Sequence, residues 1–200
     1  MARKGRSPKG KSFNKKTLIS CEGKVETLYF KMLKEKYSKN NVSVSIIEQS
    51  SQGSKLVDKA VKKSKNFEEV YVVFDRDNLT NDQLSEALTL AKKNNIKILL
   101  TVQQFEYWLL LHFEHYNNST NKQLLERKLC THIGVSKWNE FKSDKFNDLR
   151  QYFIDNINTA NNNAQKLNLK DINLNNQDLF NNPYTNISYY LKDIFNVKNL

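Results

Sequence analysis

The chain has 200 residues, enough for one substantial hydrophobic core or two small ones. Lys and Arg number 32 against 21 Asp and Glu, a net charge of +11 that favours polyanionic partners, nucleic acid first. The two cysteines exclude a disulfide framework, and the sequence has neither a signal-type apolar segment nor an apolar run of about 18 residues. We therefore expect a cytoplasmic protein without a membrane span.

The chain begins with a basic segment, followed by the first strand and helix. Lys and Arg crowd into residues 1–16, which predicts a flexible tail that is either solvated or in contact with phosphates. The apolar run over 17–21 predicts a strand, and apolar residues from Val25 to Leu33 recur at helical spacing. Between them, Gly23 is expected to allow a backbone conformation that a side chain would resist.

Strand and helix patterns then alternate along the chain. The predicted strands cover 42–47, 70–74 and 96–102, and the predicted helices lie near 56–61 and 80–93. Thr80 and Gln83 fit a capping box at the start of the second of these helices. The run 70–74 is apolar throughout, as in a central parallel strand covered on both faces. Together these units predict an α/β fold with a small doubly wound, mainly parallel sheet, whose ligands bind at the carboxyl ends of the strands.

The rest of the chain reads as helical. Residues 105–113 are apolar almost all round, which predicts a helix packed on several sides. Beyond Thr120 the strand signals fade, and the apolar spacing predicts three or more helices. The predicted organisation is a basic tail over 1–16, an α/β domain over 17–116 and a helical extension over 117–200 that docks on the sheet.

Four acids follow two of the predicted strands. Glu22 comes directly after the first strand, with Glu26 four residues on, and Asp75 and Asp77 follow the third strand. Since parallel strands end at the same edge, these carboxylates should converge, and they would repel unless protons or a cation joined them. Hard oxygen ligands suit Mg²⁺ or Mn²⁺. The alternative is that acids after strands serve only as helix caps, but the paired occurrence favours a metal site.

Other ionisable residues of the chain have separate expected roles. Glu106 lies in the apolar helix, where an unpaired charge is costly, so it should meet a basic partner, a metal or the pocket edge. Lys24 and Arg76 alternate with the acids and could clamp a phosphate. The histidines lack zinc-site spacing, and each of them, His112 included, is expected at the surface or an interface. Cys21 is expected to be a small buried hydrophobe.

The order of these motifs resembles a known domain. A strand, Glu22-Gly23, a helix, another strand and Asp75-x-Asp77 are similar to the Toprim domain of topoisomerases, bacterial primases and overcoming-lysogenization-defect type nucleases. The closer resemblance is to the RloB family, also called the AbiLii family, of bacterial defence loci. It rests on residues 20–26, 73–77, 105–113 and 182–185. One departure is Gln103-Gln104, where this family is expected to have Asn-Pro.

The resemblance implies a Toprim-type nuclease acting in anti-phage abortive infection with an ABC or AAA ATPase encoded nearby. DNA or RNA, tRNA included, would be the substrate, and homo-oligomerisation stays open. The implied catalytic residues are Glu22, Asp75 and Asp77, the metal ligands are Glu22, Glu26, Asp75, Asp77 and Glu106, and the phosphate-binding residues are Lys24 and Arg76. The alternative is a non-catalytic subunit that binds nucleic acid or a partner. A haloacid dehalogenase-type phosphatase is discounted because Leu79 stands where Thr or Val is required.

Overall fold

The structure is a computed structural model that describes residues 15–37, 42–76, 79–118, 120–140, 146–167 and 183–200. Asp77 and the first 14 residues of the predicted basic tail lie outside this described part. Lys15 and Lys16 already belong to the first strand. No helix within the described ranges is both long enough and apolar enough to cross a membrane.

The described residues form a five-stranded sheet in the order β2-β1-β3-β4-β5. The first four strands are parallel, and β5 runs antiparallel to β4. The strands are β1 (Lys15–Cys21), β2 (Val42–Glu48), β3 (Glu69–Asp75), β4 (Lys97–Val102) and β5 (Tyr184–Thr185). The chain leaves β1 toward β2 on one side and returns to β3 on the other, so the switch point lies between β1 and β3.

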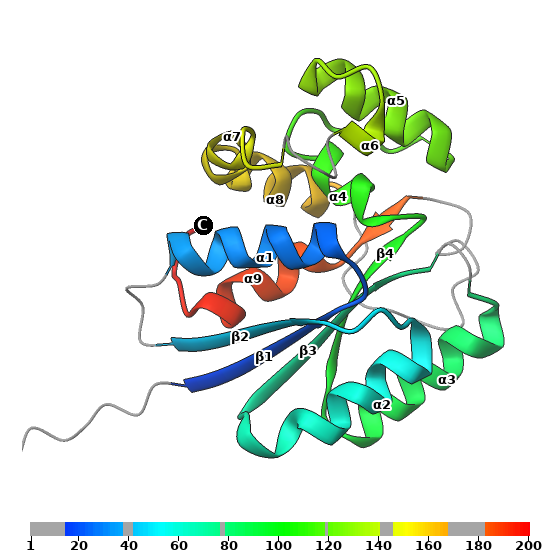
Figure 1. Cartoon of the computed structure of the whole chain (residues 1–200), viewed down its shortest axis with the longest axis vertical. Helices are drawn as coiled ribbons and strands as arrows, with labels where there is room; N and C mark the ends of the chain where they lie inside the picture. Colours follow the sequence, from blue (N-terminus) through cyan, green and yellow to red (C-terminus); the bar gives the residue numbers. More distant parts are fainter. Residues whose placement is uncertain (1–14, 38–41, 77–78, 119, 141–145, 168–182) are drawn as a thin grey trace, which may run out of the picture.

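Helices cover both faces of this sheet (Figure 1). Helices α2 and α3 lie on one face, α1 and α9 lie on the other, and α4 to α8 gather beyond α1. The α/β class, the mainly parallel sheet and the helical C-terminal extension are therefore confirmed. The helices are α1 (Lys24–Lys36), α2 (Gly53–Lys63), α3 (Asn81–Lys93), α4 (Phe105–Leu110), α5 (Lys122–Ile133), α6 (Trp138–Glu140), α7 (Arg150–Asp155), α8 (Ile157–Gln165) and α9 (Ile187–Phe195).

The predicted start of α3 is confirmed in detail. The Gln83 backbone N–H donates to the Thr80 hydroxyl at 3.2 Å, and the Thr80 backbone N–H donates to the Gln83 side-chain carbonyl at 2.9 Å. This reciprocal pair satisfies backbone N–H groups that the first turn of a helix leaves without partners. Asn94 caps the other end of α3, which ends at Lys93 as the predicted range 80–93 expects.

Alternate residues of the strands pack into different cores, which explains the continuous apolar runs. In β3, Val72 and Phe74 pack with α2 and α3, whereas Tyr71 and Val73 pack into the larger core beneath α1 and the helical extension. Since side chains alternate along a strand, Asp75 continues the series of Tyr71 and Val73. The strand register therefore places Asp75 on the side of the sheet that carries α1.

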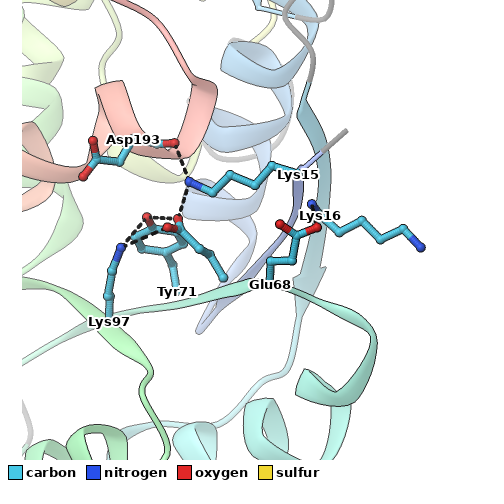
Figure 2. A network of polar contacts seen from close by, with 7 residues as sticks. Lys15, Lys16, Glu68, Tyr71, Lys97 and Asp193 are labelled. Carbon is cyan, nitrogen blue, oxygen red and sulfur yellow. Dashed lines mark hydrogen bonds and ion pairs between the residues drawn. The ribbon is translucent and has the colours of Figure 1, made fainter. Parts of the chain in front are cut away.

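A polar network ties the elements together at the amino ends of the strands (Figure 2). The Glu69 carboxylate pairs with Lys15 at 2.8 Å and with Lys97 at 3.3 Å, and it accepts a hydrogen bond from the Tyr71 hydroxyl at 2.5 Å. Lys15 also donates to the backbone carbonyl of Asp193 in α9 at 3.4 Å. Burial alone would raise the pKa of Glu69, but these donors and the charge of Lys97 lower it below its usual value. The network joins β1, β3, β4 and α9 at the end of the sheet opposite the acids.

The C-terminal segment closes the edge of the sheet, which was not predicted. Thr185 and Tyr184 pair with β4, and the next residue, Asn186, continues the ladder with its side chain. Its carbonyl oxygen accepts the Leu100 backbone N–H at 2.8 Å, and its amide nitrogen donates to the Ile98 carbonyl at 2.9 Å. A single amide thus satisfies two backbone groups that an edge strand would otherwise leave exposed.

Candidate metal centre

Glu22 and Asp75 lie side by side at the switch point. The Glu22 backbone N–H donates to the Val73 carbonyl at 3.0 Å, which holds the end of β1 against β3. The Asp75 backbone N–H in turn donates to Glu22 Oε2 at 3.4 Å. The structure therefore brings these two predicted residues together at the carboxyl edge of the sheet.

Glu26 approaches the same point from the first turn of α1. This helix begins at Lys24, so the Glu26 carboxylate lies near the positive end of the helix dipole. Glu26 is only 6% exposed. A Cβ atom at Gly23 would come within 3.1 Å of Glu26 Oε2. The φ angle of Gly23 is −132°, an extended conformation that any residue adopts, so the prediction of a special backbone conformation was wrong. Gly23 instead leaves room for the Glu26 carboxylate.

Asp75 has a strongly raised pKa. Burial raises its pKa well above the usual value, and the charges of Glu26, Glu106 and Glu22 raise it further. A hydrogen bond from the backbone of Phe105 acts in the opposite direction. The Oδ1 atom is buried and has no hydrogen-bond partner among the residues that the structure describes. A carboxylate in these surroundings would be stabilised by a proton or a cation.

Glu106 accepts a hydrogen bond from a tryptophan. It is the second residue of α4 and is 5% exposed, and its Oε1 accepts a hydrogen bond from Trp138 Nε1 at 2.8 Å. Trp138 belongs to α6, and sequence reasoning missed it because nothing near it in the chain points to the acids. The charge of Glu106 raises the pKa of Asp75, so Glu106 belongs electrostatically to the cluster.

The predicted phosphate-binding cations lie near the acids in different environments. Lys24 is exposed at the start of α1. Arg76 directly follows Asp75 and is half-buried, and its Nη2 donates to the Asn81 side-chain carbonyl at 2.8 Å. The structure therefore has one exposed cation and one cation anchored by a hydrogen bond, each within two residues of an acid along the chain.

The cluster offers the ligand chemistry of a divalent cation without a preformed cage. Within the described ranges, no group of three or more His, Cys, Asp and Glu side chains is arranged to hold a metal ion. Asp77 lies outside those ranges, so its part in the site stays a prediction. The donor set of Glu22, Glu26, Asp75 and Glu106 consists of hard carboxylate oxygens, which fit Mg²⁺ or Mn²⁺. Their ligation would require rotation of these side chains or a contribution from Asp77.

Two other predictions concern residues of the core. Cys21 is fully buried, as expected of a small hydrophobe. His112 was expected at the surface or an interface, which is wrong, because it is 1% exposed and packs against Tyr29, Trp108 and Phe153. Its Nε2 lies 3.1 Å from the Tyr29 hydroxyl and its Nδ1 lies 3.1 Å from the Trp108 carbonyl. Burial lowers the pKa of His112 to about 3.

These features define a doubly wound α/β protein with buried acids at its switch point, consistent with a Toprim-like fold. The family model described as RloB-like protein matches residues 17–194, from β1 into α9. The chain therefore belongs to the RloB-like family, which confirms the resemblance drawn from its motifs. Neither the curated proteins nor the solved structures yielded a match to the chain.

Proposed function

We propose that the chain is a divalent-metal-dependent nuclease that hydrolyses phosphodiester bonds of DNA or RNA. The observation that carries the proposal is the Asp75 carboxyl. Burial and the charges of Glu26, Glu106 and Glu22 raise its pKa, and its buried Oδ1 has no hydrogen-bond partner in the described part of the chain. Strongly perturbed carboxyl groups that converge at a switch point are typical of functional sites.

The acids would have different roles in metal binding and in proton transfer, according to their positions. Glu26 and Asp75, with Glu106 and the predicted ligand Asp77, would hold Mg²⁺ or Mn²⁺. Glu22, which lies at the rim between β1 and β3, would coordinate as well or act as the general acid or base. When bound, the cation supplies activation of a water molecule and offsets negative charge on the transferring phosphoryl group.

Positive charge around the acids supports a polyanionic substrate. Lys24 is free to reach a phosphate from the exposed start of α1, while the guanidinium of Arg76 can bind phosphate oxygens in a fixed orientation. The net charge of +11 attracts nucleic acid at moderate salt. Activity in anti-phage abortive infection, together with an ABC or AAA ATPase, is the part of the proposal that rests on family membership.

A cleavage assay tests the proposal. The purified protein is incubated with DNA and RNA substrates in Mg²⁺ or Mn²⁺, beside Asp75→Asn and the matched control Asp148→Asn, which changes an exposed aspartate away from the site. We expect Asp75→Asn to lower the cleavage rate about a hundredfold or more, and the control to retain it. Equal cleavage by Asp75→Asn, or no cleavage even with the partner ATPase present, would contradict the assignment.

A non-catalytic subunit that binds nucleic acid or a partner is the second candidate. The excess of positive charge favours it, because that charge attracts nucleic acid whether or not the acids hold a cation. Calorimetry separates the two functions. Nucleic-acid affinity that stays unchanged when Glu22, Glu26, Asp75 and Asp77 are all neutralised, in a protein that cleaves nothing, supports the binding role.

A further inference from the structure

A cavity lies at the carboxyl end of β4, and most of the residues that line it are polar. Its volume is about 380 Å³, and its lining includes Arg76, Val102, Gln103, Gln104, Asn121 and Lys122. Arg76 follows Asp75 in the chain, and Gln104 precedes Phe105, whose backbone forms a hydrogen bond with the Asp75 carboxyl. The cavity and the acids therefore share two stretches of backbone.

Gln104 is one of the polar residues that line this cavity. The residue is only 5% exposed, and its side chain does not cap helix α4, which begins at the next residue. The buried acceptor that has no partner among the described residues is Oε1 of the neighbouring Gln103. Two side-chain amides, those of Gln103 and Gln104, thus line the cavity, and one of them has an acceptor without a partner in the described part of the chain.

The neighbouring Gln103 holds the loop between β4 and α4 in an unusual conformation. Its φ angle is +80°, in the left-handed region that a residue other than glycine rarely adopts. Its side-chain amide donates to the backbone carbonyl of Thr120, just before α5. Backbone strain of this kind persists where the surrounding structure enforces it, and it clusters at binding and catalytic sites.

The charges around the cavity select the class of ligand. Arg76 and Lys122 are cationic, and none of the described lining residues is acidic. Arg and Lys bind phosphate, whereas side-chain amides pair with the donors and acceptors of a base edge. A volume of about 380 Å³ falls within the range of about 300–1,000 Å³ that is usual for ligand pockets. A nucleotide combines a base edge with a phosphate at this scale.

We propose that this cavity holds one unpaired nucleotide of a single-stranded nucleic acid. Gln104 and Gln103 contact the base edge, and Arg76 and Lys122 bind the adjoining phosphates. The base must be unpaired because its Watson–Crick edge is occupied in a duplex. That the next phosphate reaches Asp75 rests on the proposed nuclease function, but occupancy of the cavity does not.

Fluorescence anisotropy in a chelator tests the cavity without any cleavage. A labelled single-stranded oligonucleotide is compared with an abasic strand of the same length, which keeps the phosphates and lacks the bases. We expect the protein to bind the base-containing strand about tenfold more tightly, a preference of about 1.4 kcal/mol. Gln104→Met should abolish this preference, whereas the matched control Gln165→Met, at an exposed position of α8, should keep it.

The ratio of the affinities for the base-containing and the abasic strand distinguishes loss of base recognition from loss of folding. If Gln104→Met fails to fold, it binds neither oligonucleotide. The near-isosteric Gln104→Glu then serves as the second variant, and it must lose the preference as well. Equal binding of both strands by the unaltered protein would overturn the proposal. So would a preference that survives in a folded Gln104 variant. Failure of the metal-dependent cleavage assay would leave this measurement unaffected.

Discussion

Asp75 lies at the carboxyl end of β3, where burial of its carboxyl and the charges of three neighbouring carboxylates raise its pKa. Since the folded-state pKa lies above the unfolded value, protonated Asp75 contributes stability at low pH, and this contribution is lost as the pH rises through the folded-state pKa. At neutral pH, metal-free protein therefore carries an electrostatic penalty at this position. An isosteric neutral side chain would remove that penalty.

We accordingly expect Asp75→Asn to be more stable than the unaltered protein at neutral pH in a chelator. The difference should shrink as the pH falls toward about 4, where the unfolded-state carboxyl takes up its proton. Urea unfolding across this pH range measures it, and Asp148→Asn, at an exposed site, should show no comparable change. A destabilised Asp75→Asn at neutral pH would show that the carboxyl is already satisfied by a partner.

His112 is a second buried titrating group, with the opposite dependence on pH. Its pKa is lowered to about 3, so the neutral imidazole stabilises the fold fully above the unfolded-state pKa of about 6.5. As the pH falls from there toward about 3, unfolding takes up a proton, and the free energy of unfolding should drop by about 1.4 kcal/mol per pH unit.

His112→Phe tests this contribution. Phenylalanine keeps the ring contacts with Tyr29 and Phe153 but does not titrate, so the acid slope of the free energy of unfolding should become shallower. The exposed His115 provides the control, since His115→Gln should leave the slope unchanged. An unchanged slope in His112→Phe would mean that acid sensitivity arises elsewhere.

Among the elements, β4 depends on a residue far along the chain. Asn186 pairs with the backbone of Ile98 and Leu100 at the edge of the sheet. Asn186→Leu leaves that N–H and that C=O without partners in a buried setting, and we expect a loss of about 2–4 kcal/mol in the free energy of unfolding. Chemical denaturation measures the loss against Asn162→Leu, at an exposed position of α8, which should cost less than about 0.5 kcal/mol. Equal losses in both variants would contradict this role.

The sequence predicted the elements whose pattern is long enough to repeat. The four parallel strands and the capping box of α3 match because apolar runs and cap residues act locally. β5 has two residues, too few for an alternating pattern, and α7 has six, less than two helical turns. These short elements are stabilised by tertiary contacts, which local sequence does not encode.

Some residues of the candidate site were predictable from the sequence and others were not. Glu22, Glu26 and Asp75 were predictable because parallel strands bring their carboxyl ends to one edge. Trp138 and Gln104 were not, since their roles depend on how α6 and the loop before α4 pack. The surface position predicted for His112 was wrong because it rested on the polar character of histidine. Its neighbours in the sequence are almost wholly apolar, which indicates a buried segment.

In the whole molecule, the α1 side of the sheet and the C-terminal helices share one core. Phe153, Ile157 and Leu191 belong to the same hydrophobic cluster as Tyr29 and Trp108. Because Trp138 of α6 also holds Glu106, the helical extension positions one wall of the acid cluster. The acids are thus supported from both parts of the chain, within a protein whose overall charge is strongly positive.

The central claim is that these acids bind a divalent cation, and calorimetric titration with Mn²⁺ tests it most directly. We predict saturable binding by the unaltered protein and by Asp148→Asn, with affinity lowered about tenfold or more in Asp75→Asn because a ligand and its charge are lost together. No detectable binding by the unaltered protein, or equal affinity in Asp75→Asn, would contradict the account.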